Sequence, residues 1–384
     1  MKGRTSTTGS MFYAINIEDR IRADHPLRMM RAVVNSILID LAPQLDACYS
    51  DVGRPSVPPE VLLKALLLQC LYSVRSERQL VERLDTDLLF RWFCGLDPAQ
   101  DVFNATAFTH NRPRLDAHGI TAAFFAAVRK RAVDAGLASD EHFSVDGTLI
   151  ESHASIKSFK PVDRDDEPDD RDSNGFKPRN PDVNFRGGRP SNATHRSTTD
   201  PEARFYRKSK GHEAKLCHMG HTITENRHGL IMSVEITEAN GRAECTAAVA
   251  MIDNLLAHGV SPKTLGADRG YDSGPCMLEL ESRGVTPHTA MRTGVIGGSK
   301  GTSRIHRKNR PLIKARERMK RRIRSAAYRL SQRARKKAEE GFGWCKTIAG
   351  LDRARHVGRW KIKQQFELAA AAFDLVRMRN LLAT

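Results

Sequence analysis

The chain has 384 residues and a formal net charge of +17, because 62 Lys and Arg outnumber 45 Asp and Glu. This length allows one large domain or two ordinary ones, each with a substantial core. No apolar run reaches the roughly 18 residues of a membrane span, and the first twenty residues lack the apolar segment of a secretory signal. Seven scattered cysteines without a CxxC pair argue against a disulfide framework or a zinc ribbon and indicate a reducing compartment.

The first third of the chain carries helical patterns only. The expected helices cover residues 28–48, 59–74, 77–95 and 104–136. Pro43 should break the first of them, and Pro58 suits a helix start. Ser76 and Gln79 resemble a capping box in front of the third helix. We therefore expect an all-α N-terminal domain over residues 1–138.

A different pattern begins near His142, where short β-branched segments alternate with amphipathic helices. The expected strands cover residues 142–150, 214–224, 229–239, 264–268 and 287–292. Helices are expected at 244–259 and 274–283. A short loop separates the second and third strands, which should therefore form a hairpin. The order β-β-β-α-β-α-β predicts an α/β domain with a mixed sheet over residues 139–384.

Two segments interrupt this domain, and a third carries most of the charge. Residues 157–212 lack any period, and seven of the ten residues at 163–172 are acidic, which predicts a polar loop insert. Residues 294–303 are rich in Gly and Ser. Residues 304–337 hold sixteen Lys or Arg and a single acid, while their apolar positions keep helical spacing. A solvated face or a membrane-surface helix is the alternative, but membrane-anchoring aromatic residues are missing, so we favour a nucleic-acid track.

Two aspartates stand where a mixed sheet could build a metal site. Metal-dependent cleavage of nucleic acids commonly uses two Mg²⁺ ions, each held by one or two carboxylates. Asp146 lies inside the first strand among apolar neighbours, and Asp268 ends the 264–268 strand. Asp146 could instead serve a turn or an ion pair, and Asp268 could cap the following turn. Asp272 competes for the second position but is better explained as a helix cap.

A third candidate lies at the end of the basic segment. Four residues follow one another at intervals of 3, 4 and 7 and share one helical face if the helix continues through the glycines behind them: Gln332, Arg335, Glu339 and Lys346. Taken alone, this pattern is better explained by a surface ion pair between Arg335 and Glu339. Glu340 is the other possible ligand.

Together these segments resemble the DDE transposases of bacterial insertion sequences, in the subgroup with a Tyr-x2-Arg-x3-Glu-x6-Lys signature. The matching segments are SVDGTLIESHAS, STTDPEARFYRKSKGHEAKL, MGHTITENRHGLI, GADRGYDS and KKAEEGFGWCKTIAGLDRARH. SERQLVERLDTDLLFRWFCGL resembles the helical domain of these enzymes. The resemblance implies an RNase H-like catalytic domain behind an N-terminal helical transposase domain that binds DNA ends or mediates dimerisation.

The activity that this resemblance implies is cut-and-paste DNA transposition. Phosphodiester cleavage at the ends of the element would be followed by transfer of the 3′-OH strand to target DNA. Asp146, Asp268 and Glu339 would be the catalytic carboxylates and the metal ligands for two Mg²⁺, which Mn²⁺ could replace.

The resemblance also implies DNA-binding residues and partners. Arg335 and Lys346 match signature positions that would neutralise phosphate. Gln332 replaces the signature tyrosine and can hydrogen-bond DNA but cannot stack on a base. Trp344 could offer a stacking surface, but core packing explains it better. The expected partners are double-stranded DNA, at the terminal inverted repeats and at the target, and a second copy of the chain, in the bacterial cytoplasm at the nucleoid and without a membrane.

The order of the residues separates other functions from this one. A transposase-derived DNA-binding protein without activity, or an RNase H-like nuclease that does not join strands, stays open. A tyrosine recombinase needs its tyrosine after an HxxR motif, but Tyr328 precedes His356 and Arg359. No P-loop exists for ATP-driven chemistry. Cys217 and His221 could suggest a metal site, but packing in a strand explains them better.

Overall fold

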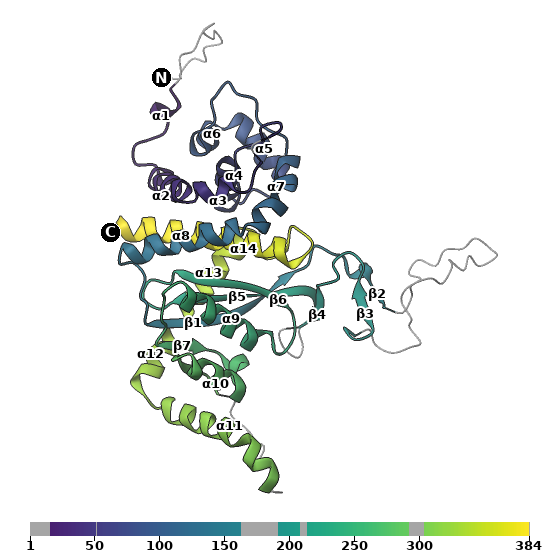
Figure 1. The fold of residues 1–384 in the computed structure, drawn as a ribbon, viewed down its shortest axis with the longest axis vertical. Helices are drawn as coiled ribbons and strands as arrows, with labels where there is room; N and C mark the ends of the chain where they lie inside the picture. The colour runs from purple at the N-terminus through teal and green to yellow at the C-terminus, as the bar shows by residue number, and fades with distance from the viewer. Residues whose placement is uncertain (1–15, 51, 163–190, 208–212, 292–302, 384) are drawn as a thin grey trace, which may run out of the picture.

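The N-terminal third folds as helices in a computed structural model of the chain (Figure 1). The structure describes residues 16–50, 52–162, 191–207, 213–291 and 303–383. The helices here are α1 (Ile17–Arg20), α2 (Pro26–Asp40), α3 (Ala42–Asp46), α4 (Pro59–Leu71), α5 (Glu77–Thr86), α6 (Leu88–Cys94), α7 (Thr106–Ala117) and α8 (Ile120–Asp134). The break near Pro43 and the start at the proline pair are confirmed. So is the Ser76 cap, whose Oγ accepts a hydrogen bond from the Gln79 N–H at 3.2 Å.

The single helix predicted over residues 77–95 is wrong, because the structure divides it into α5 and α6. Asp87 has extended backbone dihedrals between the two helices, and its carboxylate accepts a hydrogen bond from the Leu89 N–H at 2.9 Å. Asp87 is therefore an N-cap that begins a new helix, as its short acidic side chain favours.

The mixed sheet of the second domain is confirmed. Its strands are β1 (His142–Glu151), β4 (Arg204–Tyr206), β5 (Lys215–Glu225), β6 (Ile231–Glu238), β7 (Thr264–Ala267) and β8 (Thr286–Thr289). Strand β1 is central, antiparallel to β5 on one side and parallel to β7 on the other. Strand β5 also pairs with β6 and β4, and β7 continues parallel to β8. Three antiparallel strands followed by two parallel ones are the arrangement expected of an RNase H-like domain.

Helices cover both faces of this sheet. The helices α9 (Ala243–Ala257) and α10 (Gly274–Ser282) follow β6 and β7, and α9 packs on β5, β6 and β1. The other face carries α12 (Ala326–Ala334), α13 (Lys336–Thr347) and α14 (Arg359–Leu382), which contact β1, β5, β6 and β7. Side chains alternate along β1, so successive residues meet helices of opposite layers.

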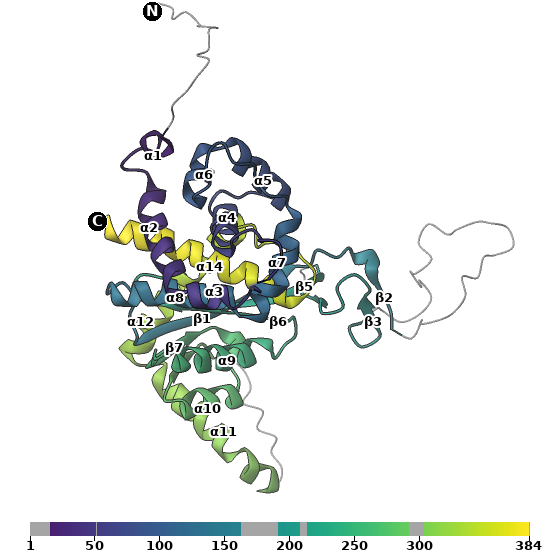
Figure 2. The ribbon, with the colours of Figure 1, turned by 45° about the horizontal axis from the view of Figure 1, so that its top comes forward.

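The long C-terminal helix α14 connects the two parts of the molecule. It packs on β6 and on α2, α4 and α8, and most of its length is buried. Both views place α8 and α14 between the N-terminal helices and the sheet (Figures 1 and 2). Arg129 of α8 donates a hydrogen bond to the Met232 carbonyl of β6 at 2.7 Å. The last helix of the chain therefore completes the core of both regions.

The polar insert predicted over residues 157–212 contains secondary structure in its described residues, 157–162 and 191–207, which corrects the expectation of a loop there. A 3₁₀ turn (Ile156–Ser158), β2 (Phe159–Pro161) and β3 (His195–Ser197) form there, besides β4. The acidic run at 163–172 lies outside the described residues, and so do residues 294–302 of the Gly- and Ser-rich segment.

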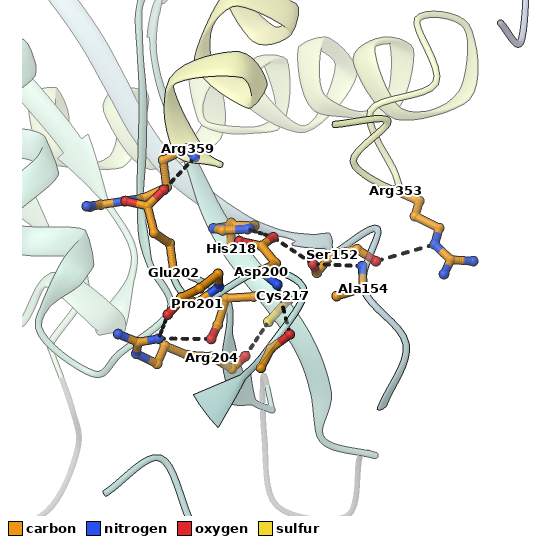
Figure 3. A network of polar contacts seen from close by, with 12 residues as sticks. Ser152, Ala154, Asp200, Pro201, Glu202, Arg204, Cys217, His218, Arg353 and Arg359 are labelled. Carbon is orange, nitrogen blue, oxygen red and sulfur yellow. Dashed lines mark hydrogen bonds and ion pairs between the residues drawn. The ribbon is translucent and has the colours of Figure 1, made fainter. Parts of the chain in front are cut away.

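A buried polar network fastens this insert to the sheet (Figure 3). The Asp200 carboxylate lies 2.8 Å from the Ser152 hydroxyl and 2.8 Å from Nε2 of His218, and all three residues are fully buried. Glu202 accepts hydrogen bonds from the backbone N–H of Arg359 and, at 2.7 Å, from its guanidinium group. These contacts join residues distant in sequence, which explains why periodicity alone did not reveal the ordered part.

The basic segment forms the helix α11 (Ser303–Arg322) and then α12, with Ser325 as the N-cap of α12. Ala315 and Met319 of α11 are buried against Met277 of α10, which confirms an apolar stripe. Leu330, expected on the same stripe, is 67% exposed, because the chain turns between α11 and α12. The predicted helix is therefore divided among three helices, α11, α12 and the start of α13, with different packing partners.

Candidate active site

The two predicted aspartates lie at one level of neighbouring parallel strands. Ser144 of β1 pairs with Gly266 of β7, and the pairing ends there. Asp146 lies two residues beyond Ser144, and Asp268 lies two residues beyond Gly266. Both aspartates are half-buried. Parallel strands that separate at this level leave room for a ligand between them.

Local hydrogen bonds orient both carboxylates. The Gly147 N–H donates to Oδ1 of Asp146 at 2.9 Å, and the Gly270 N–H donates to Oδ1 of Asp268 at 2.7 Å. Asp268 thereby caps the 3₁₀ turn Arg269–Tyr271, as the alternative explanation of this residue anticipated. A carboxylate has two oxygens, so a hydrogen bond from a neighbouring backbone N–H does not by itself prevent ligand binding.

Asp272, the competing position, forms an ion pair with the basic helix α11. Its carboxylate is buried and pairs with the Arg316 guanidinium at 3.0 Å. It does not cap α10, since Ser273 is the N-cap residue there and makes no side-chain cap. Asp272 therefore anchors the basic helix α11 to the sheet domain.

The structure adds a carboxylate that the sequence did not indicate. Glu244, in the first turn of α9, extends its carboxylate over Gly147 and Gly270. A Cβ atom at Gly147 would lie 3.5 Å from Oε1 of Glu244, and one at Gly270 would collide with Oε2. The same Cβ at Gly270 would lie 3.0 Å from Oδ1 of Asp268. In the sequence, only a glycine close to each aspartate pointed to this contact, and a glycine alone does not indicate which residue packs against it.

Two buried polar side chains line the same place. Burial raises the pKa of Tyr271, and the negative charges of Glu244, Asp146 and Asp268 raise it further. Burial lowers the pKa of His221 to about 4, so its imidazole is neutral at physiological pH. Within the described residues, the Tyr271 hydroxyl and Nδ1 of His221 have no hydrogen-bond partner. The site therefore combines carboxylates with unsatisfied polar atoms.

Cys217 and His221, weighed as a metal site, have different surroundings in the structure. Cys217 is buried against Met219 and Ala243, which confirms packing as its explanation. His221 lies opposite Gly147 in the pairing of β1 and β5, and its Nε2 is 2.8 Å from Oγ1 of Thr237.

The four residues expected on one helical face lie on two helices. The helix that carries Glu339 continues through Gly341 and Gly343, but Arg335 separates it from the helix before it. Gln332 belongs to α12, whereas Glu339 and Lys346 belong to α13. Glu339 is exposed in the first turn of α13, which packs on β1 and β5. In the part of the chain that the structure describes, no three His, Cys, Asp or Glu side chains converge as a metal-binding group. The role of Glu339 beside Asp146 and Asp268 stays a prediction.

The other signature positions lie close to the strand ends. Nε2 of Gln332 donates hydrogen bonds to the carbonyls of Ala267 and His288, at the ends of β7 and β8. Oε1 of Gln332 accepts a hydrogen bond from Arg335 at 3.3 Å. Gln332 thus links α12 to the sheet, and a DNA contact at this position stays a prediction.

Lys346 and Trp344 lie further along α13. Lys346 lies 3.8 Å from Asp352 in a weak ion pair. Trp344 packs against Phe373 with ring centroids 5.7 Å apart, so core packing is confirmed as its explanation.

The exposed face of α11 to α13 is strongly basic. Its exposed basic residues are Arg310, Lys314, Lys320, Arg321, Arg324, Arg329, Arg333 and Lys336. Arg316, Arg318 and Arg322 instead pair with Asp272 and Glu281 and hold α11 on the domain. The basic residues thus divide into an anchoring set and a set that faces solvent.

The two predicted aspartates carry the kind of donor that a hard divalent cation prefers. Asp146 and Asp268 offer carboxylate oxygens, and Mg²⁺ prefers oxygen ligands and accepts one or two carboxylates because water and phosphate complete its shell. The negative charges of Glu244, Asp146 and Asp268 all raise the pKa of Tyr271, so the three carboxylates lie near the same buried hydroxyl.

Comparison with known proteins agrees with this geometry. A family described as "Transposase DDE domain" matches residues 138–375, and one described as "Transposase domain (DUF772)" matches residues 15–114. No curated protein and no solved structure matches the chain. The described helices include none that is long and apolar enough to cross a membrane. With a transposase domain matched over more than half of its length and an RNase H-like sheet, the chain belongs to the DDE transposases, enzymes of metal-dependent DNA cleavage and strand transfer.

Proposed function

We propose that the chain carries out cut-and-paste transposition with Asp146 and Asp268 as the paired metal-binding carboxylates. The register of β1 and β7 supports this most directly, since it brings both aspartates to the level where the strands separate. When bound, two Mg²⁺ or Mn²⁺ ions would supply the Lewis acidity for phosphodiester hydrolysis and for attack by the freed 3′-OH. The aspartates contribute oxygen ligands whose orientation their backbone hydrogen bonds already set.

Glu339 is the proposed third carboxylate. It lies in the first turn of α13, a helix that packs on β1, the strand of Asp146. Its exposure leaves the side chain room to turn, and a divalent cation held by the aspartates would attract its carboxylate. The adjacent Glu340 pairs with Arg377 at 3.4 Å and so has a structural use of its own.

DNA would lie along the basic face of α11 to α13. Arg335 packs against Gly266, close to the aspartates, and can bind two phosphate oxygens at once. Lys346 adds a point charge on α13. Gln332, held between Arg335 and the strand ends, would orient that arginine and meet the DNA backbone. Sequence-independent phosphate contacts of this kind supply much of the affinity of DNA-binding proteins.

The division of labour between domains is part of the proposal. Residues 1–138 would bind the terminal inverted repeats or mediate dimerisation, and residues 139–384 would perform the chemistry. Joining two ends of an element requires two active sites, so the working form would be a homodimer on DNA. Such work on chromosomal DNA would be carried out at the bacterial nucleoid.

The test is cleavage and strand transfer on a supercoiled plasmid that carries the element's own ends, with Mg²⁺. Asp146→Asn, Asp268→Asn and Glu339→Gln should bind the ends but neither cut nor join. Glu340→Gln is the matched control for Glu339 and should remain active. Activity in Glu339→Gln would contradict its role. Wild-type cleavage without joining would indicate a nuclease, and binding without cleavage a silent DNA-binding protein.

A further inference from the structure

The loop that joins α13 to α14, residues 348–358, is held on the end of β1, and we call it the junction loop. The Glu151 N–H donates to the Asp352 carbonyl at 3.0 Å, and the Ala354 N–H donates to the Glu151 carbonyl at 2.7 Å. Arg353, between these two contacts, is exposed and points away from the buried network of Figure 3. The strand therefore fixes the loop and leaves the Arg353 side chain in solvent.

Positive charge is concentrated in the junction loop and at the start of α14. Residues 353–363 contain five Lys or Arg and no acid. Two of these charges are neutralised, because Arg359 pairs with Glu202 at 2.7 Å and Lys363 pairs with Glu235 at 2.8 Å. In the described parts of the chain, no carboxylate pairs with the other three, which are Arg353, Arg355 and Lys361.

Arg355 is a half-buried cation without an anion of its own. Burial lowers the pKa of Arg355, and the charge of Arg112 lowers it as well. Glu77 lies near enough to raise that pKa, but it already forms an ion pair with Arg112. Within the described residues, the Arg355 guanidinium makes one hydrogen bond, to the Ala349 carbonyl at 3.1 Å. Such a cation is costly to bury, so an anion bound beside it would stabilise the folded chain.

His356 shows that these charges gather at one place. Burial, together with the positive charges of Arg112, Lys361 and Arg355, lowers the pKa of His356 to about 3, so its imidazole is neutral at physiological pH. Nζ of Lys361 lies 5.1 Å from the centroid of the Trp360 ring, which steadies the ammonium group. The cations come from α7, the junction loop and α14, so this surface lies where the N-terminal helices meet the sheet domain.

The position of this surface favours duplex DNA as the anion. Asp146 and Glu151 are five residues apart on β1, a distance of about 17 Å at about 3.3 Å per residue. Duplex DNA advances about 3.4 Å per base pair, so about five base pairs span that distance. A duplex that is cut at Asp146 can therefore place a phosphate on the junction loop. Because the loop follows α13 directly, it extends the basic face of α11 to α13 toward the N-terminal helices.

We propose that Arg353, Arg355 and Lys361 bind the phosphate backbone of duplex DNA about five base pairs from the bond that is cut. This inference rests on the proposed function, because the position of the cut at Asp146 comes from it. The surface adds the junction of the two domains to a DNA path that otherwise follows α11 to α13. Phosphate contacts of this kind position the duplex and do not read its sequence.

The test is the salt dependence of DNA binding by the full-length protein, measured by fluorescence anisotropy on a duplex that carries one end of the element. Divalent metal is omitted, so that binding is measured without cleavage. Arg353→Gln and Lys361→Gln should each reduce the slope of log affinity against log salt by about 1. Lys363→Gln is the matched control, since it removes the same charge two positions after Lys361, where Glu235 already neutralises it. The slope of this control should equal that of the wild type.

A second measurement tests where the contact lies. Single neutral methylphosphonates are placed in turn along the duplex, and each replaces one charged phosphate. For the wild type, the replacement about five base pairs from the cut should weaken binding. For a variant that combines Arg353→Gln, Arg355→Gln and Lys361→Gln, the same replacement should have no further effect. Equal losses in both proteins at every position would overturn the inference.

The results also separate this surface from the proposed function. Circular dichroism and the melting temperature without DNA would show that each variant is folded. Wild-type slopes in Arg353→Gln and Lys361→Gln, with normal plasmid cleavage by the wild type, overturn this inference and leave the proposed function standing. Reduced slopes in both variants, with a wild type that binds the ends but never cuts, support the surface and overturn the proposed function.

Discussion

Glu367 provides a quantitative test of the packing between α8 and α14. Its side chain is 5% exposed, and Oε2 accepts a hydrogen bond from the Thr121 hydroxyl at 2.6 Å. Burial raises the pKa of the Glu367 carboxyl from 4.5 to about 7, although the Thr121 hydrogen bond and the charge of Lys363 partly oppose the rise. The folded chain therefore holds this proton more tightly than the unfolded chain does.

The consequence is a loss of stability as the pH rises. Between about pH 4.5 and about pH 7, Glu367 is protonated in the folded chain and ionised in the unfolded chain. Each pH unit in that window lowers the free energy of unfolding by about 1.4 kcal/mol. The whole window amounts to about 3 kcal/mol, most of it between pH 5 and pH 8, and the loss is complete above the folded pKa.

Glu367→Gln removes this titration and keeps an oxygen that can accept from Thr121. Urea unfolding of both proteins at pH 5 and pH 8 gives the variant-minus-wild-type difference at each pH, in which all other titrating groups cancel. That difference should shift in favour of the variant by about 3 kcal/mol at the higher pH. Thr121→Val should extend the pH dependence of the wild type, since it removes a bond that lowers the pKa of Glu367. An equal difference at both pH values would refute the reasoning.

Three further predictions concern the scaffold and the basic face. Gly266→Ala places a Cβ 2.8 Å from a serine oxygen of α12 and should lower the free energy of unfolding, measured with denaturant, by about 1–3 kcal/mol. Gly343→Ala, whose Cβ would have nothing within 4 Å, should raise it by about 0.5–1 kcal/mol. Equal effects of the two substitutions would contradict the packing at Gly266. Asp200→Asn should cost about 3–5 kcal/mol at neutral pH, and this loss should shrink in acid. Burial raises the pKa of Asp200, but the hydrogen bond and charge of His218 outweigh burial, so the pKa of Asp200 in the folded chain is lowered. Asp200 therefore stabilises the fold at pH values above the ordinary aspartate pKa. This stabilisation is lost as the pH falls through the pKa of Asp200 in the folded chain. Replacing Arg321 and Arg324 together by Gln should weaken DNA binding and reduce the slope of log affinity against log salt by about 2, and an unchanged slope would remove this face from the DNA path.

Local signals in the sequence predicted the elements and the two aspartates. Strand and helix periods placed β1, β5, β6, β7 and β8 and nearly all helices, because side-chain alternation is a property of the chain segment itself. Asp146 and Asp268 could be chosen because a charged residue within or directly after an apolar strand is conspicuous. The division at Asp87 was missed, since a capping aspartate inside an amphipathic pattern gives only a weak local signal.

The sequence by itself determined the mixed-sheet catalytic domain, the helical region before it and the basic helices, and it predicted Asp146 and Asp268 as a pair. Only the tertiary structure decided which other groups meet those aspartates. Glu244 enters through the packing of α9 against β1 and β5, and the short strands of the insert depend on Asp200 meeting His218. Contacts between residues far apart in the chain leave no periodic trace in either segment, because each depends on how separate elements pack and not on the local preference of either one.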